Sequence, residues 1–191
     1  APNEAEVHGL VALMEIQASR ARARVGPTGE PILLLDQDRS RWDFMLIGRG
    51  LAALDRAEKL GARRGKYTLQ AAIAACHGRA RKAEDTDWVR IASYYEDLAR
   101  LTASPIVELN RAVAISMAYG PALGLELVDT LVAEPSLKNY HLLPAVRADF
   151  LSKLGRHEEA RAEFERAASM TRNAKEKEIL IGRAAASGAS S

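Results

Sequence analysis

The sequence contains one cysteine, Cys76, among its 191 residues. A single thiol cannot form an intrachain disulfide, and it excludes a metal site built from several thiolates. Aromatic residues are also scarce, at 5% of the chain. A core that is built mainly from alanine and leucine favours helix-on-helix packing over sheet packing. The low cysteine content is typical of a reducing compartment, so we predict a cytoplasmic location.

Long apolar runs and a strong net charge are absent as well. No stretch approaches the roughly 20 apolar residues of a membrane span, and residues 1–7 lack the apolar centre of a secretion signal. We therefore predict no membrane partner. The formal net charge of +2 does not by itself indicate nucleic-acid binding, although residues 20–64 hold ten Lys or Arg against six Asp or Glu. Because the first residue is not Met, we expect a fragment of a longer protein.

The chain from Tyr67 onward shows regular helical periodicity, interrupted by glycine, proline and short polar turns. Short connections make neighbouring helices pack antiparallel, as hairpins. The pattern therefore predicts an all-α fold. The expected helices span residues 67–82, 87–102, 105–119, 121–133, 140–154, 157–171 and 174–186.

A sequence repeat relates two of these hairpins, because placing Gly120 on Gly155 gives a period of 35 residues. The second copy follows the tetratricopeptide pattern, with small residues where two helix backbones approach and an aromatic residue between hairpins. Ala160 and Ala167 are the small residues, and Phe164 is the aromatic one. Gly155 is expected to end its helix in a left-handed turn.

These patterns predict a tetratricopeptide-like, right-handed solenoid of antiparallel helix hairpins, preceded by a short helical subdomain. Residues 65–186 would form the solenoid, in which the helix at 174–186 is the cap. Residues 1–64 would form the preceding helical segment, and residues 187–191 a disordered tail. A solenoid presents a concave groove that is lined by the first helix of each hairpin. The candidate protein-binding residues of this groove are Gln70, His77, Asn110, Arg111 and Arg147.

The N-terminal segment begins with a predicted helix that runs from an Asn3–Glu6 capping box to about Arg24. Its apolar stripe is expected to contain Val7, Leu10, Met14 and Ala18.

The stretch LLLDQDRSRWD, residues 33–43, follows this helix after a turn. It is not a calcium loop, because Arg41 stands where an EF-hand needs glycine and Ile47 where it needs glutamate. Ser40 and Asp43 predict a capping box at the start of the next helix. The capping box leaves the remaining charged residues of this stretch unexplained.

Motifs for catalysis are absent from the sequence. It has no G-x-S-x-G, no phosphate-binding glycine loop and no pair of histidines at helical i, i+4 spacing. We therefore predict that the protein is not an enzyme and that it uses no metal and no cofactor.

Several blocks in fixed order resemble one family. They are EVHGLVALMEI, LLLDQDRSRWD, KYTLQAAIAACHGRA followed by DTDW, SPIVELNRAVAI, and YHLLPAVRADFLSKLGR. Together they resemble the C-terminal extension of bacterial extracytoplasmic-function (ECF) sigma factors that carry tetratricopeptide repeats. The resemblance extends from about Glu6 to Arg183. In that family the regions that bind DNA and RNA polymerase precede this segment, and this chain contains neither.

The resemblance implies a regulatory domain that controls transcription initiation through protein–protein contacts. The implied partners are the sigma regions of the same full-length chain, RNA polymerase core or a regulatory protein, with DNA contacted only through the sigma regions. We expect a docking patch or brace between subdomains, in which tryptophan supplies apolar area and mixed charges set the register. The residues of this patch are Asp36, Asp38, Arg39, Arg41 and Trp42.

Two other readings stay open from the sequence. The first is a free-standing tetratricopeptide scaffold that binds peptide tails, because an amide and a guanidinium at Asn110 and Arg111 can hold a carboxylate or a peptide backbone. The second is a small-molecule sensor or an enzyme, with a pocket between the helices of residues 1–60 and the solenoid.

Overall fold

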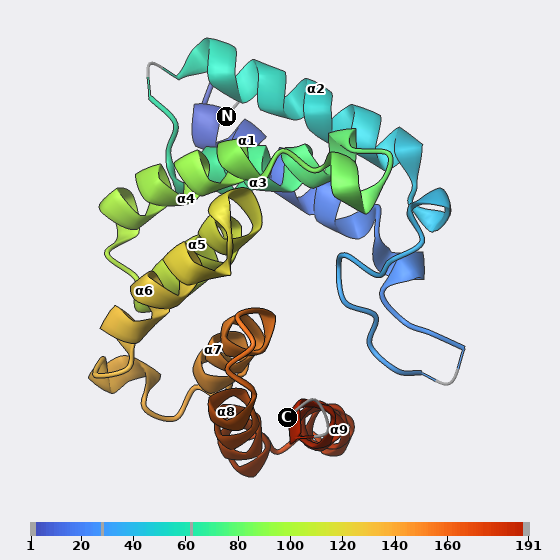
Figure 1. Ribbon diagram of the computed structural model, residues 1–191. Coiled ribbons are helices and arrows are strands. Elements are labelled where there is room, and N and C mark those ends of the chain that lie inside the picture. The colour runs from blue at the N-terminus through green and yellow to red at the C-terminus, as the bar shows by residue number, and fades with distance from the viewer. Residues whose placement is uncertain (1–2, 28, 62, 189–191) are drawn as a thin grey trace. The chain divides into compact units, whose positions relative to one another are not determined.

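The computed structural model describes residues 3–27, 29–61 and 63–188, and the regular elements within these ranges are all helices (Figure 1). This confirms the predicted all-α class. Two compact units divide the chain between Thr102 and Ala103. Inside each unit, most helices pack on their neighbours in sequence, which is the solenoid-like arrangement. None of the helices in the described ranges has both the length and the apolar character needed to cross a membrane.

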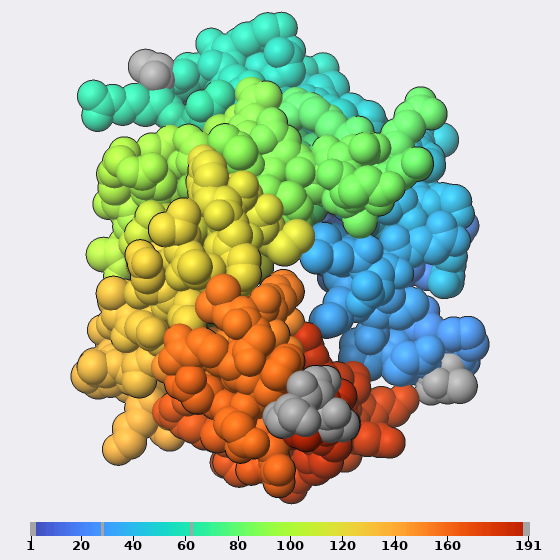
Figure 2. Space-filling view, viewed as in Figure 1, coloured from blue at the N-terminus to red at the C-terminus, as the bar shows by residue number. Residues whose placement is uncertain are grey.

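Unit 1 is built around α1, which packs against both α2 and α3. α4 forms a hairpin with α3, and Figure 2 shows the outer surfaces of α2 and α4. The helices of unit 1 are α1 (Ala5–Ala18), α2 (Phe44–Leu60), α3 (Lys66–Arg79) and α4 (Trp88–Thr102). Short 3-10 turns lie at Ala21–Ala23, Arg39–Arg41 and Ala83–Asp85.

Small residues let the helices of unit 1 approach closely. A Cβ atom at Gly9 of α1 would lie 2.7 Å from the backbone nitrogen of Thr68 on α3, so a side chain there would push the two helices apart. The buried residues of α3 that face its neighbours include Ala71, Ala72 and Ala75. This packing explains how the chain forms a core with few aromatic residues.

The division between the units differs from the predicted boundary at residues 64 and 65. Because α3 packs closely on α1, the α3–α4 hairpin belongs to the same unit as α1 and α2. The sequence periodicity marks where helices begin and end, but it does not show which helices share a core.

Unit 2 is a series of helices in which α5 packs on α6, α6 on α7, α7 on α8 and α8 on α9. Its core contains two large, fully buried aromatic side chains, Phe150 and Phe164. The helices of unit 2 are α5 (Pro105–Tyr119), α6 (Pro121–Leu131), α7 (Leu142–Lys153), α8 (His157–Met170) and α9 (Ala174–Gly188), with a 3-10 turn at Pro135–Leu137.

The repeated residues of unit 2 have the predicted structural roles. Gly155 follows α7 with a φ of 75°, and Gly120 follows α5 with a φ of 106°, a region that favours glycine. Ala160 and Ala167 of α8 are fully buried, and Phe164 lies between them in the core. The two hairpins thus share a glycine of positive φ after their first helix, while the turns themselves differ: the Gly120 N–H donates to the carbonyl of Ser116 and that of Gly155 to the carbonyl of Ser152.

The first helix is shorter than the sequence predicts. It ends at Ala18 rather than near Arg24, and the chain continues into a 3-10 turn. The Ser19 hydroxyl donates a hydrogen bond to the carbonyl of Ile16 at 2.7 Å, which satisfies a carbonyl at the helix end.

Both predicted capping boxes are wrong. Glu6 accepts hydrogen bonds from the backbone N–H groups of Tyr67 and Thr68, so it caps α3 rather than its own helix. Asp43, not Ser40, is the N-cap of α2. At the other end of the chain α9 continues to Gly188, so the predicted tail at 187–191 begins too early, and residues 189–191 lie outside the described ranges.

Candidate protein-binding surfaces

The DQDRSRW stretch folds as a 3-10 turn that leads into α2. One oxygen of Asp38 accepts hydrogen bonds from the backbone N–H of Ser40 at 2.9 Å and from its hydroxyl at 2.7 Å. The same kind of bond at Asp43 caps α2, because its carboxylate accepts from the N–H groups of Met45 and Leu46. Asp38 and Asp43 therefore have local roles in stabilising successive turns.

Arg39 points into unit 1, where it is only 7% exposed. Its guanidinium donates to the carbonyl of His77 at 2.8 Å and to that of Ala80 at 2.7 Å. A further bond reaches the hydroxyl of Thr86 at 3.1 Å. The carbonyls at a helix C-terminus lack partners within the helix and carry partial negative charge. Arg39 thus holds the 3-10 turn against the C-terminal end of α3.

Trp42 is also buried, and two arginines stack on it. The Cζ atom of Arg39 lies 4.9 Å from the ring centroid, and that of Arg20 lies 5.8 Å from it. Both distances fall within the range of cation–π attraction. Trp42 packs in a small apolar cluster with Ala23 and Ile47. Its apolar area is therefore used inside unit 1.

His77 lies in the interior of unit 1 as well, at 7% exposure. Its ring contacts Trp88 edge to face, with ring centroids 5.2 Å apart. Burial, reinforced by the positive charges of Arg20 and Arg39, lowers the pKa of His77 to about 4. The imidazole is therefore neutral near pH 7, and it offers little surface to a bound peptide.

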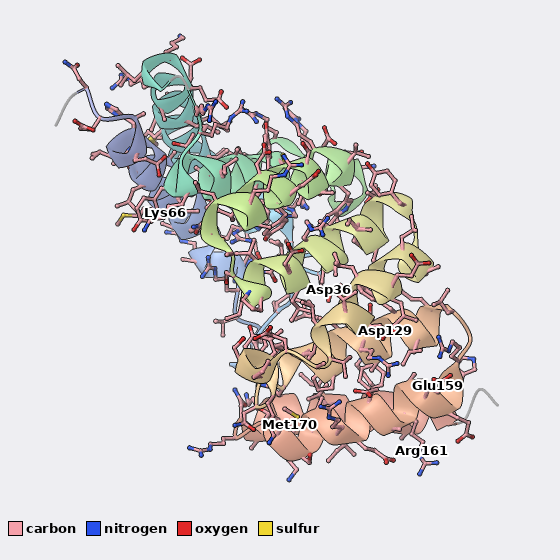
Figure 3. All side chains as sticks on the ribbon, turned by 90° about the vertical axis from the view of Figure 1, so that its left-hand side faces the viewer. Asp36, Lys66, Asp129, Glu159, Arg161 and Met170 are labelled. Atoms are coloured by element: carbon pink, nitrogen blue, oxygen red, sulfur yellow. The ribbon has the colours of Figure 1, made fainter. Side chains whose placement is uncertain are left out.

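The exposed part of the predicted docking patch is smaller than the sequence suggests. Asp36, Asp38 and Arg41 are exposed, whereas Arg39 and Trp42 are buried. Figure 3 labels Asp36 in the loop before the 3-10 turn. Beside this turn lies an open cavity of about 460 Å³, lined by Arg22, Ser40, Arg41, Trp42 and Asp43. The docking role of these residues stays a prediction.

The predicted groove residues of unit 2 are partly occupied by contacts inside that unit. Arg111 donates from Nε to Glu108, one turn earlier on α5, at 2.8 Å. Asn110 is exposed on the same helix. In unit 1, Gln70 is partly exposed on α3. The predicted groove therefore draws on residues of both units.

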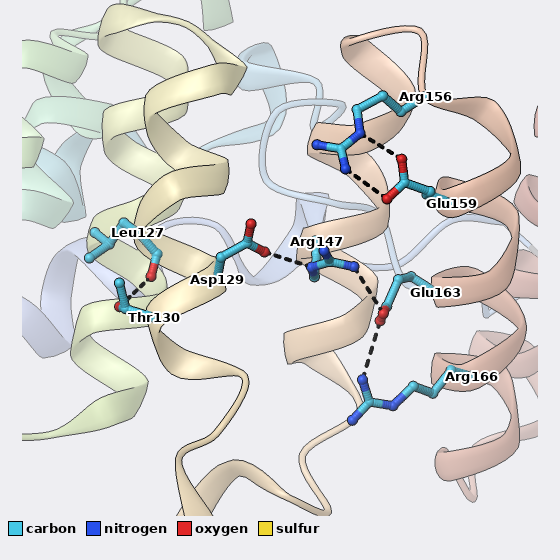
Figure 4. Close-up of polar contacts among 8 residues, drawn as sticks. All are labelled: Leu127, Asp129, Thr130, Arg147, Arg156, Glu159, Glu163 and Arg166. Carbon is cyan, nitrogen blue, oxygen red and sulfur yellow. Dashed lines mark hydrogen bonds and ion pairs between the residues drawn. The ribbon is translucent and has the colours of Figure 1, made fainter.

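Arg147 connects three helices of unit 2 (Figure 4). Its Nε donates to Asp129 of α6 at 2.7 Å, and a terminal nitrogen donates to Glu163 of α8 at 3.1 Å. Arg166 also reaches Glu163. Burial opposes the charge of Arg147, but the two carboxylates raise its pKa overall. Its guanidinium is therefore committed to holding α6, α7 and α8 together.

The apolar stripe predicted on α1 faces away from the core of unit 1. Val7, Leu10 and Met14 are exposed, whereas Gly9, Ala12 and Ile16 of the same helix are buried. The core face was missed because it contains glycine and alanine, which carry little hydrophobic signal. The tight approach of α1 to α3 requires such small residues, and this cannot be read from spacing alone.

Metal-ligating residues do not cluster in the part of the chain that the structure describes. Within the ranges that the structure describes, no group of three or more His, Cys, Asp or Glu side chains could hold a metal ion.

Comparison with known proteins gives a partial match. A family model described as "Family of unknown function (DUF6596)" matches residues 1–58. An uncharacterized protein of Rhizobium meliloti (strain 1021) is 45% identical over 175 residues, which cover 92% of this chain and 41% of that protein. The chain thus spans about two fifths of the length of the curated relative that it matches. No solved structure matches.

Proposed function

We propose that this chain is a regulatory domain of an ECF-type RNA polymerase sigma factor, which controls transcription initiation through protein–protein contacts. The observation that carries the proposal is the ordered set of sequence blocks between about Glu6 and Arg183 that resembles this family. Its partners would be the sigma regions of the same polypeptide, or polymerase itself, in the cytoplasm. DNA would be contacted only through the sigma regions, and the domain would catalyse no reaction.

The length of the relative supports the proposal. A protein of which this chain spans about two fifths has room for further domains, as a sigma factor with a C-terminal extension requires. The all-α architecture agrees with a binding role, since stacked helices offer extended surfaces for other polypeptides.

The DQDRSRW turn supplies a physical basis for docking. Arg39 and Trp42 fix the turn from inside unit 1, so the exposed charges of Asp36 and Arg41 project from an anchored loop. Charges held in a fixed arrangement select the partner and its register more than they add affinity. In this proposal the buried residues brace the turn, and the exposed ones meet the partner.

The test is reconstituted transcription by the full-length protein with RNA polymerase. We compare Arg41→Glu with Arg56→Glu, a matched charge reversal at another exposed arginine, on α2. We expect Arg41→Glu to change transcription at least fivefold with unchanged thermal unfolding, and Arg56→Glu to behave as the wild type. Loss of the whole domain should also change transcription. If the full-length protein directs no polymerase to any promoter, the proposed function is wrong.

A further inference from the structure

Helix α1 is apolar on two faces. The face formed by Gly9, Ala12 and Ile16 packs in the core of unit 1. A helix at the surface of a globular protein normally carries polar residues on the opposite side, and a helix that is apolar all round is normally covered all round. The second face of α1 therefore needs an explanation that the fold of unit 1 does not supply.

The second face is a continuous stripe. Its residues follow the spacing i, i+3, i+4 and i+7, which places them next to one another on a helix surface. Their exposed fractions are 45% for Val7, 36% for Leu10, 42% for Val11 and 62% for Met14. We name these four residues the α1 stripe. They expose on the order of 300 Å² of apolar side chain, and contiguous patches of that size are often interaction sites.

We propose that the α1 stripe binds a helix from the part of the longer polypeptide that lies outside this chain. This inference rests on the proposed function, because that function places the domain in a protein with further regions. It names a contact surface that is separate from the exposed charges of the DQDRSRW turn.

The size of the stripe favours a partner in the same polypeptide over a second copy of the chain. A helix of 14 residues is about 21 Å long. Its stripe of about 300 Å² is well below the roughly 800 Å² per partner that stable complexes between separate proteins bury. A covalent link supplies an effective concentration of about millimolar, at which a small interface is sufficient.

The spacing of the stripe specifies the chemistry of its occupant. An amphipathic helix binds such a ridge through its own apolar residues at i, i+3 or i+4 and i+7, with polar residues outside the contact. More than half of the longer relative lies outside the part that matches this chain, which is ample length for such a helix.

The test measures solvent access to the stripe in two contexts. Met14→Cys is introduced together with Cys76→Ala, which removes the one native thiol. The rate of maleimide labelling is measured in the 191-residue chain and in the full-length protein. Ala52→Cys, on the exposed side of α2, is the matched control. We expect labelling at position 14 to be at least tenfold slower in the full-length protein, and labelling at position 52 to be the same in both.

Adding Val11→Glu should restore fast labelling at position 14 in the full-length protein, since the charge disrupts an apolar contact. Equal rates at position 14 in both proteins would overturn the proposal. Slow labelling of position 14 in the 191-residue chain would also overturn the proposal. If the labelling rate then fell with rising protein concentration, a second copy of the chain would be covering the stripe. If the rate did not depend on concentration, the chain itself would be covering it. If position 14 is protected from labelling in a full-length protein that has no transcription activity, the binding role of the α1 stripe is supported and the proposed function is refuted.

Discussion

Arg39 and His77 are 38 residues apart in sequence, yet the guanidinium of the first donates a hydrogen bond of 2.8 Å to the backbone carbonyl of the second. With the bond to Ala80, it satisfies two carbonyls at the C-terminal end of α3. Replacing Arg39 by methionine nearly keeps the volume but removes the donor of both carbonyls, one in a buried bond and the other in a partly buried one. We expect Arg39→Met to lower the free energy of unfolding of unit 1 by about 3 kcal/mol.

Tryptophan fluorescence during urea unfolding measures this loss in unit 1, because both tryptophans, Trp42 and Trp88, lie there. Arg41→Met is the control, since that side chain is exposed, and it should change stability by less than about 0.5 kcal/mol. Equal effects of the two substitutions would show that Arg39 does not brace the turn.

Glu6 of α1 caps α3, and its pKa should link the stability of unit 1 to pH. Burial alone would raise the pKa of this carboxyl, but hydrogen bonds from Thr68 and from backbone N–H groups outweigh it and lower the pKa below its usual 4.5. The charged form is therefore favoured in the folded state. Its contribution is complete above about pH 4.5 and is lost as the pH falls through the lowered folded value.

Glu6→Gln should lower the free energy of unfolding of unit 1 by about 1 kcal/mol at pH 7. The difference in this free energy between the variant and the wild type should become smaller in acid. Urea unfolding at a series of pH values measures the gap. Glu4→Gln is the control, because the Glu4 side chain makes no capping hydrogen bond. A gap that stays constant from pH 7 to pH 3 would contradict the assigned role.

His77 should titrate far below an ordinary histidine. Its pKa of about 4, against the usual 6.5, means that the unfolded chain binds the proton more readily than the folded one. The neutral form stabilises the fold fully above pH 6.5, and this stability is lost as the pH falls from 6.5 to about 4. The total loss is on the order of 3 kcal/mol. NMR of the His77 ring should show no protonation at pH 5.5, whereas a midpoint near 6.5 would contradict its burial.

Arg147 of unit 2 bridges two carboxylates from different helices, and its side chain is only 20% exposed. Arg147→Met should destabilise unit 2 by about 1 to 2 kcal/mol, because it leaves the partly buried Glu163 without this partner. Arg161→Met is the control, because it removes an exposed ion pair with Glu165 within α8. Arg161 is labelled in Figure 3, and its substitution should lower the stability of unit 2 by less than about 0.5 kcal/mol.

Hydrogen exchange of the backbone amides of α6, α7 and α8 measures how much each of the two substitutions, Arg147→Met and Arg161→Met, destabilises unit 2. If the two substitutions lower the stability of unit 2 by the same amount, the bridge that Arg147 makes between α6, α7 and α8 in Figure 4 does not stabilise the unit.

The α-helices of residues 66–188 could be predicted to within three residues at every end. Glycine and proline mark their boundaries, as at Gly120 and Pro121, and the periodicity between these marks is regular. Local chemistry determines such boundaries, so one sequence is enough to find them.

Contacts between distant residues could not be predicted. Glu6 and Asp43 both stand where a capping residue is expected, but Glu6 caps a helix that begins 60 residues later in the chain. Arg39 looks like a surface arginine because nothing near it in sequence indicates that it meets the end of α3. The docking patch was predicted as one surface, and only the packing of unit 1 separates its buried brace from its exposed charges.

The most direct test of the proposed regulatory, protein-binding role is an NMR titration of the labelled 191-residue chain with the further regions that this proposal assigns to the full-length protein. We predict that resonances of the α1 stripe and of Asp36 and Arg41 shift in a saturable manner, while those of the buried core of unit 2 stay in place. The absence of any shift at millimolar concentration would contradict the account, because even a weak interface that functions within one polypeptide is detectable under these conditions.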